Sequence, residues 1–141
     1  MNLRYLTRQY ESLTGMYVQA KLQFQAVLDQ VFSEYRDVFG DLYSKVSLRF
    51  LALYPTSQSV LAMSQETVTA KILRLVGHVI TNRWSLEKTQ ILIAAAKRNP
   101  FKKTAFPSHL ISLELLINLL LYFQNTSVGN EIMFLSKSGM G

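Results

Sequence analysis

Apolar and aromatic residues recur with a helical period over the first thirty positions of the chain. Their spacing alternates between three and four residues without a break, which is the heptad pattern of a helix that packs along one seam. The positions are Leu3, Leu6, Tyr10, Leu13, Tyr17, Ala20, Phe24, Val27 and Val31. The pattern predicts a first helix of about 30 residues, roughly 42 Å long from Leu3 to Val31 at about 1.5 Å per residue. We assign residues 1–37 to this long coiled-coil helix.

Such a helix needs a partner, because a small domain cannot cover so long an apolar stripe by itself. The cover can be a return helix, a second copy of the chain, or both. The bulky Tyr10, Tyr17 and Phe24 favour three or more helices around the seam, and one long helix in an ordinary bundle is the plainer alternative. We expect a homo-oligomer that forms through this helix. Its candidate oligomerisation residues are Leu6, Tyr10, Leu13, Tyr17, Phe24 and Val27.

The middle of the chain, residues 41–104, reads as a compact knot of three or four short helices. Gly40 breaks the first helix, and proline disfavours helical geometry in the residue before it, so Pro55 ends the next one. Serine and threonine side chains can cap helix N-termini. The expected helices are Leu42–Leu53, a turn from Thr56 through Met63, Gln65–Val76 capped by Ser64, and Leu86–Arg98 capped by Ser85.

The last segment, residues 106–137, is predicted to form a return helix that starts at a capping Ser108. Its most apolar run, Leu110–Phe123, has 14 residues and includes Glu114 and Asn118. A membrane-spanning helix needs roughly 20 apolar residues. The run therefore indicates a buried or oligomer-facing helix, and we expect no membrane contact. The predicted fold is all-α, a long antiparallel helical hairpin (coiled coil) tipped by the knot.

Positive charge is concentrated in one stretch of the sequence. The whole chain carries 15 basic and 9 acidic residues, a net charge of +6. Residues 71–103 hold eight of the cations against Glu87 alone, a net charge of +7. Such a surface favours a polyanionic partner, DNA or RNA. The candidate nucleic-acid-binding residues are Lys97, Arg98, Lys102, Lys103 and Arg83, and the alternative is a solvated loop that keeps an apolar protein in solution.

The sequence offers little for catalysis. It contains no cysteine, which excludes disulfides, thiol nucleophiles and thiolate metal sites and is compatible with a cytoplasmic location. Glu34, Asp37 and Asp41 could share a helical face and hold magnesium, but Gly40 interrupts that face and a solvated helix end explains them better. His78 and His109 are isolated. We expect no catalytic residue, no metal and no cofactor.

Several short motifs, in order, carry a family resemblance over roughly residues 2–100. They are Leu3-Arg4-x-Leu6-x-Arg8, Leu28-Asp29-x-x-Phe32, Val38-Phe39-x-Asp41, Ser44-x-x-x-Leu48-x-x-Leu51-x-x-Tyr54-Pro55-Thr56, Ser85-Leu86-Glu87-Lys88 and Ala94-Ala95-Ala96-Lys97. Together they resemble the central helical region of the Piv/MooV-type DEDD transposases, the insertion-sequence recombinases guided by a bridge RNA. The residues Leu135–Gly141 occupy the place of that family's Leu-x-Ser-Ile-Pro-Gly-Ile-Gly signature, with Ser138 in place of the proline and Lys137 in place of an apolar residue.

The resemblance implies a role in DNA transposition and recombination. Family members carry an acidic tetrad before this region and a nucleophilic serine after it, so residues 138–141 would begin a missing downstream domain. We expect a transposase-derived oligomerisation segment, in a cytoplasmic fragment that is inactive alone, with DNA or guide RNA as its partner. The alternative is a free-standing basic helical protein that binds DNA or RNA.

Overall fold

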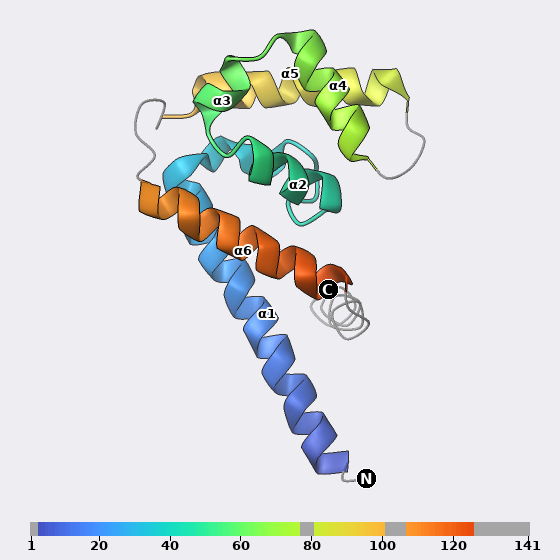
Figure 1. Cartoon of the computed structure of the whole chain (residues 1–141), viewed down its shortest axis with the longest axis vertical. Coiled ribbons are helices and arrows are strands. Elements are labelled where there is room, and N and C mark those ends of the chain that lie inside the picture. The colour runs from blue at the N-terminus through green and yellow to red at the C-terminus, as the bar shows by residue number, and fades with distance from the viewer. Residues whose placement is uncertain (1–2, 77–80, 101–106, 126–141) are drawn as a thin grey trace.

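The computed structural model describes residues 3–76, 81–100 and 107–125 (Figure 1). Within these ranges the chain is helical and contains no strand, which confirms the all-α prediction. The elements are α1 (Leu3–Val31), the 3₁₀-helix η1 (Ser33–Asp37), α2 (Lys45–Leu53), α3 (Ser57–Leu61), α4 (Gln65–Leu75), α5 (Asn82–Arg98) and α6 (Pro107–Asn125).

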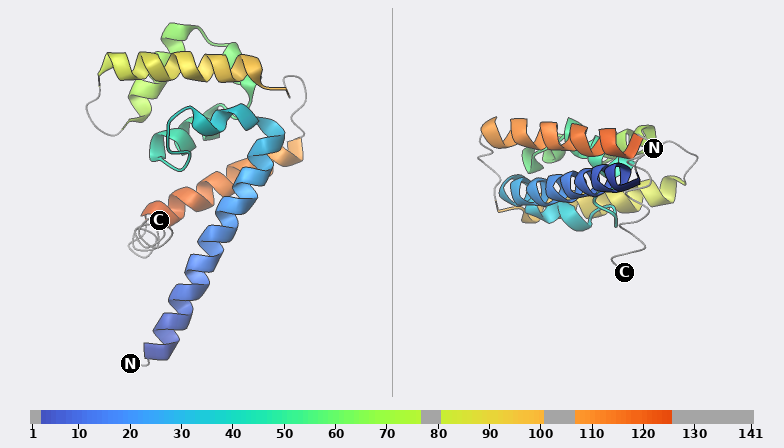
Figure 2. Two further views of the ribbon diagram at one scale, coloured as in Figure 1. Left: turned by 180° about the vertical axis from the view of Figure 1, so that it is seen from behind. Right: turned by 90° about the horizontal axis from the view of Figure 1, so that it is seen from below.

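The helices are arranged in tiers at one end of α1. Figures 1 and 2 show α3, α4 and α5 as an outer tier, α2 beneath them, and α6 crossing the C-terminal half of α1. The N-terminal half of α1 extends away from these tiers as an arm. The short-helix group and α6 therefore cover only the later part of the predicted seam, among the residues that the structure describes.

The short helices begin where the sequence supplies capping side chains. The Oγ of Ser64 accepts a hydrogen bond from the backbone N–H of Thr67 at 3.2 Å, which caps α4 as predicted. Thr56 and Ser59 form a reciprocal capping box at the start of α3. A turn precedes α2 where the sequence predicted helix. The Oδ1 of Asp41 accepts a hydrogen bond from the backbone N–H of Tyr43, and Ser44 then caps the helix. This helix consequently starts at Lys45 rather than at residue 42.

Two other predicted boundaries differ in the structure. The long helix ends at Val31 rather than at residue 37, because Phe32 leaves helical geometry at φ −150° and a short 3₁₀-helix follows. The break buries both Phe32 and Tyr35. The last helix starts with Pro107 rather than with a capping Ser108, and proline suits the first helical position because its missing N–H would have had no helical partner. The predicted continuation of this helix to residue 137 lies outside the described residues.

The cap of α5 is Thr81 and not the predicted Ser85. The Oγ1 of Thr81 accepts from the N–H of Trp84 at 3.3 Å, so the helix begins four residues earlier than predicted. Ser85 is buried inside the helix, where its carbonyl accepts from the Oγ1 of Thr89 at 2.8 Å. The same hydroxyl of Thr89 lies 2.8 Å from that of Thr69 on α4. Thr81 therefore caps this helix, and Ser85 lies within its first turn.

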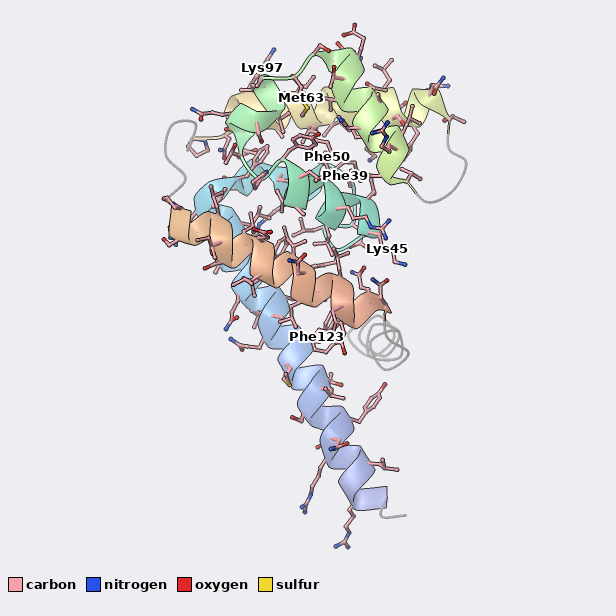
Figure 3. The ribbon with its side chains drawn as sticks, in the orientation of Figure 1. Phe39, Lys45, Phe50, Met63, Lys97 and Phe123 are labelled. Atoms are coloured by element: carbon pink, nitrogen blue, oxygen red, sulfur yellow. The ribbon has the colours of Figure 1, made fainter. Side chains whose placement is uncertain are left out.

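A chain of aromatic contacts links α1 to the outer tier. Tyr35 lies between Phe32 and Phe39, with ring centroids 5.4 and 6.0 Å away. Phe39 then contacts Phe50 on α2 at 6.1 Å and Trp84 on α5 at 6.4 Å. Figure 3 shows Phe39 and Phe50 between α2 and the outer tier. Rings at such separations add to the burial of apolar surface, so this chain of contacts fixes the tiers relative to α1.

Buried Asn99 joins three elements at the other end of the outer tier. Its Nδ2 donates to the carbonyl of Val31 at 3.2 Å and to the Oγ of Ser57 at 3.3 Å. The asparagine follows the last residue of α5, whereas its two partners end α1 and begin α3. These bonds satisfy a helix-end carbonyl that would otherwise be buried without a partner.

The buried tyrosines predict a loss of stability at alkaline pH. Burial raises the pKa of Tyr17 to about 12, and burial also raises the pKa of Tyr35 and Tyr43 above the ordinary value of 10. Because the folded state then holds protons that the unfolded chain releases, stability is complete below pH 10 and falls as the pH rises through the folded pKa values.

We expect Tyr35→Phe to reduce the steepness of this fall by up to about 1.4 kcal/mol per pH unit. The substitution also removes the hydrogen bond from the Tyr35 hydroxyl to the carbonyl of Ser47, at a cost of about 0.5–1.5 kcal/mol at neutral pH. Urea unfolding between pH 8 and pH 12 measures both effects. Equal pH slopes for wild type and Tyr35→Phe would contradict the assignment.

Candidate association and nucleic-acid surfaces

The cations predicted to contact nucleic acid do not form one cluster in the structure. Arg83 lies in the first turn of α5, whereas Lys97 and Arg98 lie in its last turn. Fourteen or fifteen helical residues place these ends about 22 Å apart. Lys102 and Lys103 lie outside the described residues. Among the described residues, the predicted site is therefore divided along one helix, with Lys97 and Arg98 as neighbours at one end of it.

Two of these cations have carboxylate partners. The Nε of Arg98 lies 3.3 Å from an oxygen of Glu34 on η1, and the Nε of Arg83 lies 3.6 Å from an oxygen of Glu87. Lys97 is exposed on the outer tier (Figure 3). Cations in the last turn also favour the helix dipole, so Lys97 and Arg98 have an ordinary structural role as well.

The described cations of the central stretch lie on a single helical layer. The helices α4 and α5 pack together, and the hydroxyl contact between Thr69 and Thr89 joins them. Together they carry six cations against the two carboxylates of Glu66 and Glu87. The cations are Lys71, Arg74, Arg83, Lys88, Lys97 and Arg98. Among the described residues, the charge is therefore spread along the two helices of the outer tier.

The predicted oligomerisation stripe on α1 has two different environments. Its later part lies in the core of one chain: Tyr17 contacts Phe123 of α6 with centroids 5.4 Å apart, and Phe24 contacts Tyr43 at 5.9 Å. Tyr17 and Phe24 are 2% and 0% exposed, so this chain already covers them. Tyr10, Leu13 and Val27 are half-buried, and Leu6 on the arm is exposed. Only the early part of the stripe is accessible.

Lys21 lies against this buried region. Its Nζ is 5.3 Å from the centroid of the Tyr17 ring and 4.6 Å from that of Tyr43. A cation over two ring faces is stabilised electrostatically and covers the rings with its methylene groups. Gln124 of α6 donates to the carbonyl of Tyr43 at 2.5 Å, and Gln25 donates to the Tyr43 hydroxyl. Tyr43 thus connects Gln124 of α6 to Gln25 and Lys21 of α1. This arrangement places no nucleophile beside a general base.

The helix α6 is apolar on two opposite faces. One face packs on α1 and α2 through Leu113, Ile117 and Leu120, all fully buried. The other face carries large apolar side chains that remain exposed: Ile111 (59%), Leu115 (64%), Leu119 (38%) and Tyr122 (66%). We call this second set the outer face of α6. The apolar run Leu110–Phe123 indicated a buried or oligomer-facing helix. In the structure only one side of this run is buried, and the outer face remains exposed among the described residues.

A small hollow lies beside one end of the outer face. It has a volume of about 120 Å³ and is lined mainly by apolar side chains of α2, α6 and the turn after α2. The lining residues include Leu51, Ala52, Pro55, Leu110 and Ile111, with Glu114 as the one ionisable group. The spacing of apolar residues in the sequence could not reveal the hollow, since it exists only where the C-terminal end of α2 meets α6.

The acidic side chains do not gather into a metal site among the described residues. Glu34 pairs with Arg98, and Asp41 accepts from the backbone of Tyr43. Within the same part of the chain no helix is long and apolar enough to cross a membrane. Comparison of the chain with protein-family models, with curated proteins and with solved structures finds no match.

Proposed function

We propose that this chain is a helical association segment, whose role is to bring copies of itself together. The observation that supports the proposal most directly is the outer face of α6, where four large apolar side chains are exposed along one side of the same helix. An apolar patch of this kind on a small protein is a common mark of a protein–protein contact. Leu6 on the arm of α1 adds a second accessible apolar position.

The family resemblance gives this segment a biological setting. Its motifs resemble the central helical region of the Piv/MooV-type DEDD transposases, so we propose that the chain is a transposase-derived segment that serves DNA transposition and recombination. Association would bring together copies of a catalytic domain that this segment does not itself supply. The arm of α1 and a return helix to residue 137 would then form a long coiled-coil hairpin.

Association predicts that thermal stability depends on protein concentration. A partner that binds only the folded chain raises the unfolding temperature by mass action, so a folded oligomer melts at a higher temperature when it is more concentrated. We expect the melting temperature to rise steadily over a hundredfold range of protein concentration. A melting temperature that is the same at every concentration would argue against the proposal.

A second candidate function is nucleic-acid binding, and the layer formed by α4 and α5 favours it. Its cations outnumber its carboxylates, and exposed Arg74 and Lys97 have room to approach phosphates. Contacts of this type neutralise phosphates without reading bases, so the binding would be weak and independent of sequence. In the transposase setting the ligand would be the element's DNA or its guide RNA.

Salt dependence tests this second function. On duplex DNA the logarithm of the binding constant falls with the logarithm of salt concentration by about 0.9 per neutralised phosphate. We expect Lys102→Gln with Lys103→Gln to flatten this slope by up to about two units, and Arg74→Gln with Lys97→Gln to do the same. The control is Arg4→Gln with Arg8→Gln, on the arm at the opposite end of the molecule (Figure 1). Equal slopes in all four proteins would leave these cations a solubilising role only.

A further inference from the structure

The outer face of α6 has the spacing of a helix–helix seam. Ile111, Leu115, Leu119 and Tyr122 follow one another at intervals of four, four and three residues, which places them on one stripe of the helix. All four are exposed, and the stripe is opposite the buried Leu113. This seam is distinct from the heptad stripe on α1, whose later part the chain covers itself.

The chemistry of this seam suits a copy of itself. From Ile111 to Tyr122 the one charged side chain on α6 is that of Glu114, which lies beside the seam rather than on it. Two such faces can therefore meet without burying a charge. A two-fold contact uses the same patch on both subunits, so a patch that is complementary to itself is sufficient to form a dimer.

The hollow determines the direction in which two copies fit. Ile111 lines the hollow at one end of the seam, and Tyr122 is an exposed aromatic ring at the other end. Eleven helical residues separate them, about 16 Å along the axis. When two copies of α6 lie antiparallel about a two-fold axis, Tyr122 of each copy meets Ile111 of the other. An aromatic ring that projects from one subunit then faces an apolar recess in its partner.

We propose that two copies of this chain associate through antiparallel α6 helices, with Tyr122 of each copy seated in the hollow between α2 and α6 of the other. The inference rests on the proposed association function and names the surface that carries it. A parallel pairing would leave both hollows empty. That is unfavourable, because an unfilled apolar hollow loses packing contacts.

Single cysteines can test the pairing, because the chain has none of its own. Ser108 and Asn125 are polar and exposed, and they lie at opposite ends of α6, about 25 Å apart along the helix. Antiparallel pairing brings position 108 of one copy near position 125 of the other. We expect a short bismaleimide to cross-link an equimolar mixture of Ser108→Cys and Asn125→Cys chains, and to cross-link neither chain alone.

The other outcomes overturn the inference in different ways. Cross-linking of each variant with itself would mean a parallel pairing. A wild type that associates in solution, combined with no cross-link in any sample, would remove α6 from the interface and leave the association function standing. A wild type that stays monomeric would overturn both proposals.

A substitution of the inserted ring gives an independent readout. We expect Tyr122→Ala to weaken association at least tenfold, whereas Leu86→Ala, which shortens an exposed side chain on α5, should leave the dissociation constant unchanged. Circular dichroism of both variants tests that the fold is retained. An unchanged dissociation constant for Tyr122→Ala would contradict the seating of this ring in the hollow.

Discussion

Replacing Phe24 with alanine should lower the free energy of unfolding by about 3–5 kcal/mol, the usual cost of removing a fully buried phenylalanine. Phe24 is 0% exposed and contacts Tyr43 from the C-terminal part of α1. A domain of this size has only about 5–15 kcal/mol of stability in total, so the variant should unfold at a much lower urea concentration.

The matched control for Phe24→Ala is Leu22→Ala, two positions away on the same helix. Leu22 is 56% exposed, so its truncation removes little buried surface and should cost well under about 1 kcal/mol. Urea unfolding followed by circular dichroism gives both values. Similar costs for the two variants would mean that α1 is not covered in the way described, and that Phe24 serves the contact between copies instead.

Leu115→Glu should have the largest effect on association. The side chain lies at the centre of the outer face of α6 and is 64% exposed, so the folded monomer should tolerate a carboxylate there. In an apolar contact between two copies the same carboxylate would lose its water without gaining a partner, once in each subunit. We expect the dissociation constant to rise at least about a hundredfold, equivalent to about 2.7 kcal/mol.

Leu86→Glu, at an exposed position of α5, is the control for adding a carboxylate to the surface. Light scattering across a dilution series measures the dissociation constant of each variant, and its thermal unfolding reports whether the fold survives. A folded Leu115→Glu protein that associates as tightly as wild type would exclude the outer face of α6 from the interface.

The sequence predicted the helices well where local chemistry decides them. The heptad from Leu3 to Val31 coincides with α1, and Ser64 and Thr56 cap the helices that they were expected to cap. The predicted cap at Ser85 was wrong, because Thr81 is equally suitable as a cap and Ser85 is fully buried inside the helix. Local signals therefore located the helices more reliably than their ends.

The sequence could not determine what covers each apolar stripe. Tyr17 and Phe24 have the spacing of an intermolecular seam, yet Phe123 and Tyr43 of the same chain lie against them. In the sequence, the outer face and the buried face of α6 could not be told apart, because a helix that is apolar all round has no periodic signal. Likewise the cations of residues 71–98 looked clustered in sequence but lie along two helices.

Sedimentation equilibrium of the wild-type chain, over a range of concentrations, tests the central claim most directly. One chain weighs 16.1 kDa. Association through the outer face of α6 predicts that the average mass rises with concentration and reaches a plateau at a whole multiple of this value, with two copies the expected number. A mass of 16.1 kDa at every concentration would contradict the account, because the exposed apolar seam would then join nothing.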